Sequence, residues 1–388
     1  MAGEKTDRYS VVMAVVLAMV LVAGCGGDSG VIDTGVASMG QGRWGHTATL
    51  LEDGRLLVVG GDETFRKPSA TAEIYDLTGM WSSAGSMVEK RAGGHTATLL
   101  TDGRVLVVGG SMLTELYDPS SGQWSSAGNI ERARLWHTAT LLEDGRVLIA
   151  GGEDANSRKA FLTAEIYDPS TGEWSSTGGL AEDHSRDKAI LLDDGKVLIM
   201  GMLLTEIYDP ATGTWSLAGK MSKQRLGGYS ATKLNDGRVL VAGGETLRGR
   251  SSEIIPGGSF GGFMASHDAF LVATPKVDIY DPVAGVWSKV ANLLEPRKLH
   301  PAALLPDGRV LVIGAESAEI YDSATDTWTD AGETMKARVG GHTATLLGDG
   351  TVLIVGGNEG ADPFQPATNK DAVGLIFVEI YDPAIGWE

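Results

Sequence analysis

A unit marked by an Asp-Gly turn recurs seven times in this chain of 388 residues, and this repetition constrains the fold more than any other feature. The shortest spacing between copies is 42 residues, as from His95 to His137. Regular self-similarity at such a period predicts one repeat array with a continuous core, not the two or three separate domains that the length alone suggests. The turns begin at Asp53, Asp102, Asp144, Asp194, Asp236, Asp307 and Asp349.

Each copy is predicted to form four short strands, as residues 95–124 illustrate. His95–Leu100 alternates small or polar residues with apolar ones, and Asp102-Gly103 has the backbone freedom of a tight hairpin turn. Val105–Val108 is a continuous apolar run, typical of a strand buried on both faces. A third strand carries a Tyr, and a fourth opens with a Trp. The seven copies are expected to begin near His46, His95, His137, Asp187, Tyr229, His300 and His342.

A double glycine and a Tyr–Trp pair follow the second strand in most copies. The double glycine begins at Gly60, Gly109, Gly151, Gly243 and Gly356, whereas Gly201-Met202 and Gly314-Ala315 depart from it. With these marks, residues 36–387 resemble the kelch repeat. The resemblance implies an all-β fold, a seven-bladed kelch β-propeller with four antiparallel strands per blade around a central channel.

The ring of blades must close, because open first and last blades would expose strand edges. The last copy reaches Trp387, where its fourth strand should run, and the missing pattern occurs near the other end of the chain. Gly35-Val36-Ala37-Ser38-Met39 resembles Ala84-Gly85-Ser86-Met87, which follows Trp81. We therefore expect residues near 33–39 to add the outer strand of blade seven, within a propeller domain of residues 33–388.

The first residues differ from the repeats. Lys5 and Arg8 precede an apolar run over Val11–Val22, which is typical of a secretory signal. Val22-Ala23-Gly24-Cys25 resembles the cleavage box of bacterial lipoproteins. The resemblance implies a signal peptide over residues 1–24, lipid attachment at Cys25, a flexible tether over residues 25–32 and a protein anchored in the bacterial cell envelope. A plain signal peptide with an incidental cysteine is the alternative.

Composition excludes several classes of function. The formal net charge of −18 argues against binding nucleic acid, whose phosphates this surface would repel. The single cysteine, Cys25, excludes intrachain disulfides, thiolate metal clusters and a catalytic cysteine in the folded body. The five histidines at the start of copies come from separate blades, so most cannot meet at one metal ion. We expect a monomer with no cofactor and no metal, which meets the membrane through its lipid alone.

Arginines precede the first strand of nearly every copy and are candidate ligand-binding residues. A ring of guanidinium groups at a channel mouth would attract a carboxylate or a phosphate. The alternative is structural, with these side chains bonding backbone carbonyls between blades. The residues are Arg43, Arg91, Arg134, Arg225, Arg297 and Arg338, with Arg186 taken as the representative of blade four.

Blades four and five depart from the repeat. Asp187 and Tyr229 replace the starting histidine, and His184 stands just before Asp187. A carboxylate, an imidazole and a phenol together could bind or protonate a sugar hydroxyl, whereas drift at a redundant position is the alternative. The long loops from Glu245 to Val277 and from Asn358 to Val378 are further candidates for binding.

The sequence favours a non-enzymatic, lipid-anchored binding protein that recognises a protein or glycan ligand, possibly anionic, on the loop face. The alternatives are a carbohydrate-active enzyme, such as the sialic-acid epimerases (mutarotases) that this chain resembles, and a pure scaffold subunit of an envelope complex. Galactose oxidase is similar in its seven kelch blades, but that family needs a Tyr–Cys crosslink at copper. The folded body here has no cysteine for that crosslink.

Overall fold

The computed structural model describes residues 37–359 and 373–387, except residues 65, 155, 158, 203 and 249–269. The predictions for the signal peptide, Cys25, the tether and residues 33–36 lie outside the described residues, as do large parts of the long loops of blades five and seven. Within the described part of the chain, no helix has the length and apolar character needed to cross a membrane.

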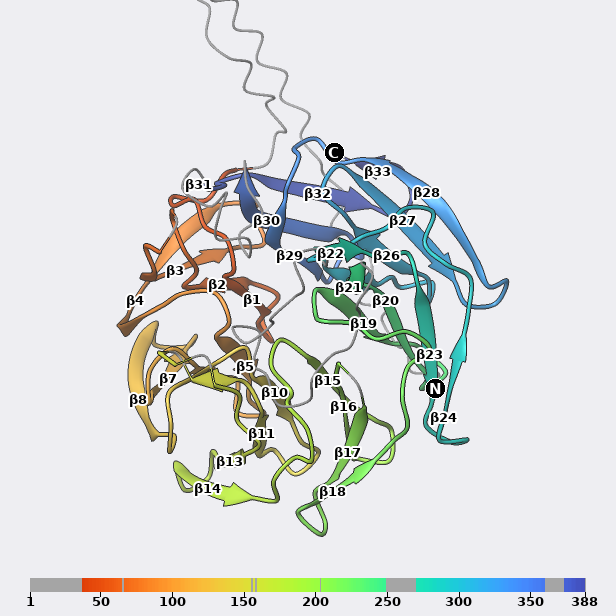
Figure 1. Ribbon diagram of the computed structural model, residues 1–388. Coiled ribbons are helices and arrows are strands. Elements are labelled where there is room, and N and C mark those ends of the chain that lie inside the picture. Colours follow the sequence, from red (N-terminus) through yellow and green to blue (C-terminus); the bar gives the residue numbers. More distant parts are fainter. Residues whose placement is uncertain are drawn as a thin grey trace, which may run out of the picture. The chain divides into compact units, whose positions relative to one another are not determined.

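Seven antiparallel sheets, each with a path of four strands, form a ring (Figure 1), which confirms the predicted seven-bladed propeller. Blades one and two comprise β1 (Thr47–Leu50), β2 (Leu56–Val59), β3 (Ser69–Tyr75), β4 (Trp81–Arg91), β5 (Thr96–Leu99), β6 (Val105–Val108), β7 (Leu113–Asp118) and β8 (Gln123–Asn129). Blades three and four comprise β10 (Thr138–Leu141), β11 (Val147–Ala150), β13 (Ala164–Asp168), β14 (Glu173–Thr177), β15 (Lys188–Leu191), β16 (Val197–Met200), β17 (Thr205–Asp209) and β18 (Thr214–Leu217).

The other three blades repeat this order. They comprise β19 (Tyr229–Lys233), β20 (Val239–Gly243), β23 (Val277–Asp281), β24 (Val286–Lys289), β25 (Ala302–Leu304), β26 (Val310–Ile313), β27 (Ser317–Asp322), β28 (Thr327–Glu333), β29 (Gly340–Leu346), β30 (Val352–Glu359), β32 (Val378–Asp382) and β33 (Gly386–Trp387). Short extra strands lie in the loops: β9 (Arg134–Leu135), β12 (Glu153–Asp154), β21 (Glu245–Arg248), β22 (Phe270–Ala273) and β31 (Val373–Gly374).

The first strand of each blade contacts the first strands of both neighbouring blades, and β29 contacts β1, so these strands surround the channel. The apolar runs of the second strands are wholly buried, as their unbroken apolar sequences predict, and only Glu359 at the end of β30 is exposed. Seven apolar clusters fill the spaces between adjacent blades, and each combines side chains from two blades. The core is therefore distributed around the ring.

The repeated Tyr and Trp pack against each other across the third and fourth strands of each blade. Their ring centroids are 5.0 to 5.2 Å apart in all seven blades. Most of the indole N–H groups also donate to a carbonyl of the preceding blade's outer strand, as Trp124 Nε1 does to Ala84 O at 2.8 Å. The aromatic residues thus join strands within a blade and blades to one another.

The N-terminal segment completes the last blade, although not as a strand. Trp81 Nε1 donates to Ala37 O at 2.8 Å, the bond that Trp124 makes to Ala84 of its own preceding blade. Met39 N donates to Ile376 O at 3.2 Å, and the Met39 side chain is buried among apolar residues of blades seven and one. Residues 37–39 do not form a β-strand. The start of the outer strand of blade seven is β33, which pairs with β32.

Replacing Met39 with alanine should destabilise the ring. Met39 is 3% exposed, so Met39→Ala leaves a cavity at the closure, and we expect a loss of about 2–5 kcal/mol in the free energy of unfolding. Urea unfolding followed by tryptophan fluorescence measures this. Met80→Ala is the matched control, since Met80 is 58% exposed. Equal effects of the two substitutions would show that residues 37–39 do not close the ring.

Candidate functional site

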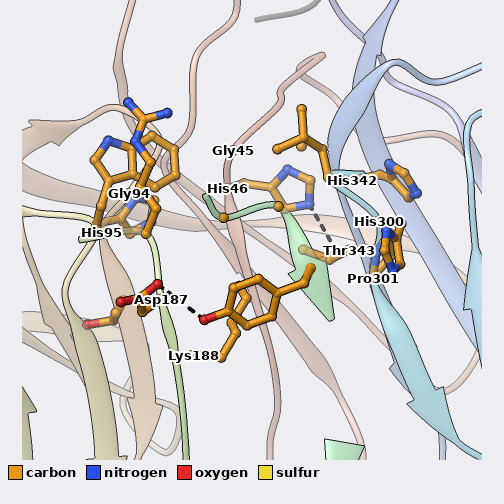
Figure 2. A pocket seen from close by; sticks show the side chains of 18 of the residues that line it. Gly45, His46, Gly94, His95, Asp187, Lys188, His300, Pro301, His342 and Thr343 are labelled. Atoms are coloured by element: carbon orange, nitrogen blue, oxygen red, sulfur yellow. Dashed lines mark hydrogen bonds between the residues drawn. The ribbon is translucent and has the colours of Figure 1, made fainter. Parts of the chain in front are cut away.

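The loops that enter the first strands, together with those strands, enclose a cavity at the mouth of the channel. Its volume is about 440 Å³, and residues of all seven blades line it. Figure 2 shows the labelled side chains around it, among them histidines of blades one, two, six and seven. The size lies within the range of small-ligand sites in proteins.

The six arginines that precede first strands do not face this cavity. Each is buried, and each pairs with a carboxylate on the third strand of its own blade at 2.5 to 2.8 Å. The expected ring of ligand-facing guanidinium groups is therefore corrected to a ring of buried ion pairs. The pairs are Arg43–Glu73, Arg91–Glu115, Arg134–Glu165, Arg225–Asp278, Arg297–Glu319 and Arg338–Glu379.

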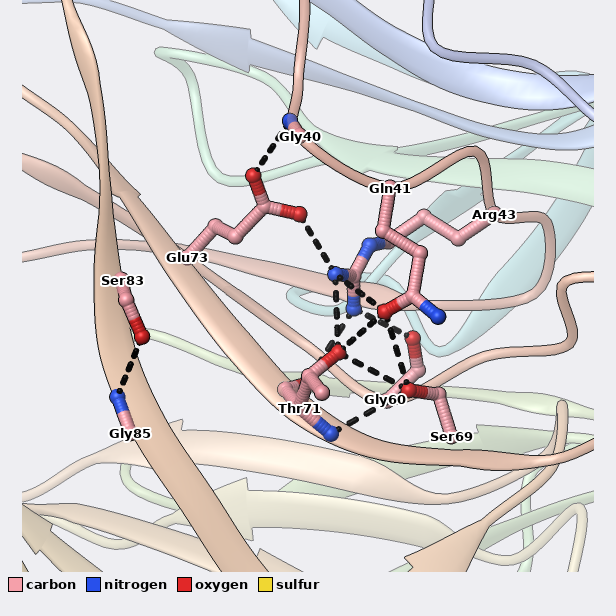
Figure 3. A network of polar contacts seen from close by, with 9 residues as sticks. All are labelled: Gly40, Gln41, Arg43, Gly60, Ser69, Thr71, Glu73, Ser83 and Gly85. Carbon is pink, nitrogen blue, oxygen red and sulfur yellow. Dashed lines mark hydrogen bonds and ion pairs between the residues drawn. The ribbon is translucent and has the colours of Figure 1, made fainter.

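The contacts of Arg43 explain why the arginines and the double glycines occur together. Its Nη1 donates to Gly60 O at 2.8 Å, and Gly60 is the first glycine of the pair (Figure 3). Glu73 receives both Arg43 Nη2 and the backbone N–H of Gly40, each at 2.6 Å. One carboxylate thus holds the loop and the guanidinium together, which satisfies the buried charges. The bonds lie within the blade and not between blades.

Blade four makes the same junction with a histidine. His184 is fully buried, and its Nε2 lies 2.9 Å from Oε1 of Glu206, the third-strand carboxylate of this blade. It stands three residues before Asp187, as Arg43 stands three before His46. His184, and not Arg186, is therefore the counterpart of the buried arginines. The sequence could have indicated these ion pairs, because an acidic residue stands two positions before the repeated Tyr in every copy, including Glu206.

Arg186 occupies a different repeated position, the residue directly before the first-strand marker. This residue has a left-handed backbone conformation in all seven blades, and four blades use glycine there. The others are Trp136, Arg186 and Leu299, with φ of 59°, 66° and 55°. The Arg186 guanidinium lies over the Trp136 ring, 4.9 Å from its centroid, and 4.0 Å from a carboxylate oxygen of Glu153. The side chains of Trp136, Arg186 and Leu299 all line the cavity.

A belt of hydrogen bonds runs around most of the channel, from a histidine of one blade to a hydroxyl of the preceding blade. Four such contacts measure 2.9 to 3.3 Å. Burial lowers the pKa of each belt histidine, to about 4 for His95 and to about 3 for His300, so these rings are neutral at physiological pH. The contacts are His46–Thr343, His95–Thr47, His137–Thr96 and His300–Ser230.

The belt is interrupted where Asp187 and Tyr229 replace histidine. Tyr229 OH lies within hydrogen-bond distance of two acceptors, Asp187 Oδ1 at 3.2 Å and Met200 O, between which its one proton is shared. Met200 O corresponds to the Val59 O bonded by His95. Tyr229 is thus a structural substitute for the histidine. The structure brings His184, Asp187 and Tyr229 together, as the sequence led us to expect, in one hydrogen-bonded chain that begins at Glu206.

Charge within this chain is set by burial and by close carboxylates. Burial lowers the pKa of His184, but hydrogen bonds to Asp187 (3.0 Å) and Glu206 (2.9 Å) outweigh it and raise the pKa to about 9. Burial raises the pKa of Asp187, against the opposing effect of His184. Burial also raises the pKa of Tyr229 well above its usual value, so the phenol keeps its proton. His184 is therefore cationic at neutral pH.

Sequence reasoning missed Lys188, which lines the cavity beside Asp187 (Figure 2). Lys188 is exposed, and desolvation by the surrounding protein lowers its pKa against the opposing charge of Asp187. No described side chain forms an ion pair or a hydrogen bond with it. The repeat could have singled out Lys188, because the corresponding residues of the other blades carry no charge. These residues are Thr47, Thr96, Thr138, Ser230, Pro301 and Thr343.

No group of three His, Cys, Asp or Glu side chains among the described residues is arranged to hold a metal ion. The belt histidines come from separate blades, and their Nε2 atoms already contact hydroxyls or carbonyls. The donor set of this cavity therefore does not fit a copper centre.

Comparison with known proteins gives the fold. No family model matches the chain, and no curated protein matches its sequence. The structure is similar to a fungal alcohol oxidase of the AA5 family in complex with copper, at 19% identity and a TM-score of 0.68, over 91% of this chain and 78% of that one. It is also similar to YjhT, at 14% identity and a TM-score of 0.53, over 76% of this chain and 96% of that one. These likenesses support the β-propeller fold; membership of the kelch family stays a prediction.

Removing one of the buried arginines should destabilise the protein strongly. Arg134→Met leaves Glu165 buried without its cation, and we expect a loss of about 3–5 kcal/mol. Arg146→Met is the control, since Arg146 is partly exposed in a turn and pairs there with Asp144, so the loss should stay below about 1 kcal/mol. Chemical denaturation measures both. If Arg134→Met lowered the free energy of unfolding as little as the control does, the buried ion pairs would not be structural, and these arginines would again be candidates for ligand binding.

The stability of blade four should depend on pH through His184. Its folded pKa of about 9 lies above the ordinary 6.5, so its stabilising contribution is complete below pH 6.5 and is lost as pH rises through 9. The difference corresponds to about 3 kcal/mol. Unfolding measured from pH 6 to 10 should show this fall in the wild type and not in His184→Arg, which keeps the pair with Glu206 without titrating. Parallel profiles for the two proteins would contradict the assignment.

Proposed function

We propose that the protein is a binding protein that takes an anionic glycan into the channel mouth, over blades three to five. One observation carries the proposal: Lys188 places an ammonium group without a side-chain partner among the described residues on the wall of a cavity that is lined mostly by uncharged side chains. The other charged residues of the lining are Arg186, Asp187 and Glu245. A carboxylated sugar offers both the anion that Lys188 lacks and hydroxyls that suit the surrounding imidazoles and threonines.

Arg186 supports the same conclusion from the rim. Its guanidinium face lies against the Trp136 indole, and this stacking contact restricts its rotation. Its side chain is 19% exposed. A planar guanidinium held in this way suits the two oxygens of a carboxylate. An acidic protein can thus bind an anion, because the cations that matter are close to the ligand and the repelling charges are screened at longer range.

The shape of the site favours a glycan over a protein ligand. The described side chains form a concave cavity of about 440 Å³, the size class of sites that enclose small molecules. The anchoring expected from Cys25 is part of the proposal: an exported protein, held at the envelope by lipid, would present this cavity to extracytoplasmic sugars.

A second candidate, mutarotation of the bound sugar, is favoured by the chain from Glu206 to Tyr229. Asp187 is a buried carboxylate on the cavity wall whose pKa is raised by burial, and it is held by a cationic imidazole. Such a group can accept and return a proton at a sugar hydroxyl. Polarimetry with freshly dissolved carboxylated sugar, with and without Asp187→Asn, tests this candidate; a rate equal to the uncatalysed one removes it.

Binding of the anionic glycan should depend on both cations. Calorimetry with the processed chain should detect N-acetylneuraminic acid or glucuronic acid and much weaker binding of glucose. Lys188→Thr and Arg186→Gly, each of which installs the residue found in other blades, should weaken acid-sugar binding about 10- to 100-fold through loss of a charged contact.

Lys289→Met, at an exposed position of the outer strand β24, is the control and should leave binding unchanged. Equal affinity for acidic and neutral sugars, or acid-sugar binding that survives both substitutions, would overturn the proposal. A tightly copurifying protein in place of sugar binding would favour the scaffold role instead.

A further inference from the structure

Blade six departs from the repeat at two positions that line the cavity, and the binding proposal uses neither. Leu299 stands directly before the first-strand marker His300, where four blades have glycine. Pro301 stands directly after that marker, where the other blades have Thr, Ser or Lys. Both residues line the same cavity as Lys188. The mouth of the channel therefore has an apolar segment on blade six and a cationic segment on blade four.

The Leu299 side chain reaches over glycines of both neighbouring blades. A β-carbon added to Gly228 of blade five would lie 3.2 Å from Leu299 Cδ2, and one added to Gly340 of blade seven would lie 3.3 Å from Leu299 Cδ1. Both distances are shorter than an ordinary carbon–carbon contact, so glycine at these two positions makes room for the leucine. Leu299 N also donates to Gly228 O at 2.6 Å, which holds its backbone to blade five.

The backbone of Leu299 does not require this side chain. Its φ of 55° is left-handed, a conformation that costs a leucine stability and that glycine adopts freely. The leucine is half-buried at the mouth, with part of its surface open. A strained apolar side chain on the wall of a cavity points to a role in what the cavity accepts.

Pro301 makes the same wall apolar below the mouth. In four blades a hydroxyl at this position contacts a histidine of the next blade, as Thr47 Oγ1 and His95 Nε2 do at 3.3 Å. Pro301 has no hydroxyl, and the described contact of His342 Nε2 in blade seven is to a backbone carbonyl, Ile313 O at 3.3 Å. Blade six thus adds no side-chain hydrogen-bonding group to the wall at either position.

The apolar segment and the cation of blade four act on one volume. Burial lowers the pKa of His300 to about 3, and the charges of Arg297 and Lys188 lower it further, so the Lys188 ammonium is near the residue between Leu299 and Pro301. In the view of Figure 2, Pro301 lies across the cavity from Asp187. A cavity of about 440 Å³ has room for a sugar with a substituent of several carbon atoms.

We propose that Leu299 and Pro301 are specificity-determining residues, which select an anionic sugar that carries an apolar substituent, an alkyl or acyl group, over the unsubstituted acid. A sugar hydroxyl placed against this wall would lose its water without gaining a partner from the two side chains. An apolar group has no such cost, and its burial there is favourable. The inference rests on the proposed function for the place of the acid group and adds which substituent enters beside it.

Two ligand series test the proposal by calorimetry with the processed chain. Methyl and butyl glucuronide differ by three methylenes in the aglycone, and N-acetylneuraminic and N-pentanoylneuraminic acid differ by three in the acyl chain. A fully buried methylene strengthens binding about fourfold, so we expect at least about tenfold tighter binding of the longer member in one series. The series that shows the gain identifies the substituent that meets the wall. Equal affinities within both series, or no binding of either longer member, would contradict the proposal.

Variants of blade six assign the gain to its side chains. Leu299→Gly, which installs the residue of four other blades, should remove the gain from methyl to butyl, and Pro301→Thr should reduce it because a hydroxyl makes the wall polar. Leu294→Gly is the matched control in the same entry loop, since Leu294 is 57% exposed and does not line the cavity, and it should keep the wild-type gain. A gain that survives Leu299→Gly would show that this wall does not select the substituent.

Methyl and butyl glucoside separate this inference from the proposed function. If acidic and neutral sugars bind equally and butyl glucoside still binds more tightly than methyl glucoside through Leu299, the apolar wall stands and the anion site falls. If the glucuronides bind through Lys188 but the butyl group gives no gain in either series, the inference falls and the proposed function remains.

Discussion

The buried carboxylate on the third strand of each blade is the interaction on which the rest of the structure depends. In six blades it pairs with an arginine, and in blade four with His184. Most of these carboxylates also accept backbone N–H groups of the entering loop, as Glu206 does from Ala181 at 3.0 Å. Entry loops held in this way fix where each first strand begins, and so fix the wall of the channel.

Much of the fold could be predicted from the sequence because its determinants are local and repeated. The Asp-Gly turns, the apolar second strands and the Tyr–Trp pairs each specify a short piece of structure, and seven copies remove ambiguity. Closure by residues 37–39 was predictable in position but not in form. Whether Ala37 and Met39 pair as a strand depends on the edge that blade seven leaves open, and no local pattern records this.

The candidate site was predicted only in part, for a physical reason. Spacing located His184, Asp187 and Tyr229, but it could not show which way an arginine side chain turns. Arg43 and its counterparts turn away from the channel because a buried carboxylate lies there, and that contact joins residues far apart in sequence. Lys188 was missed for the opposite reason, since its significance lies in the absence of a described partner.

The three left-handed side chains at the mouth have a consequence for how this protein can evolve. Trp136, Arg186 and Leu299 each hold a conformation that glycine adopts freely, at a cost of about 1 kcal/mol or more apiece. Glycine at these positions would relieve the backbone strain and stabilise the ring, so random substitution followed by selection for stability would tend to remove the three side chains. The strained Arg186 and Trp136 therefore set the stability of the ring against use of the channel mouth, and comparing these three positions among relatives would reveal which of them still use it.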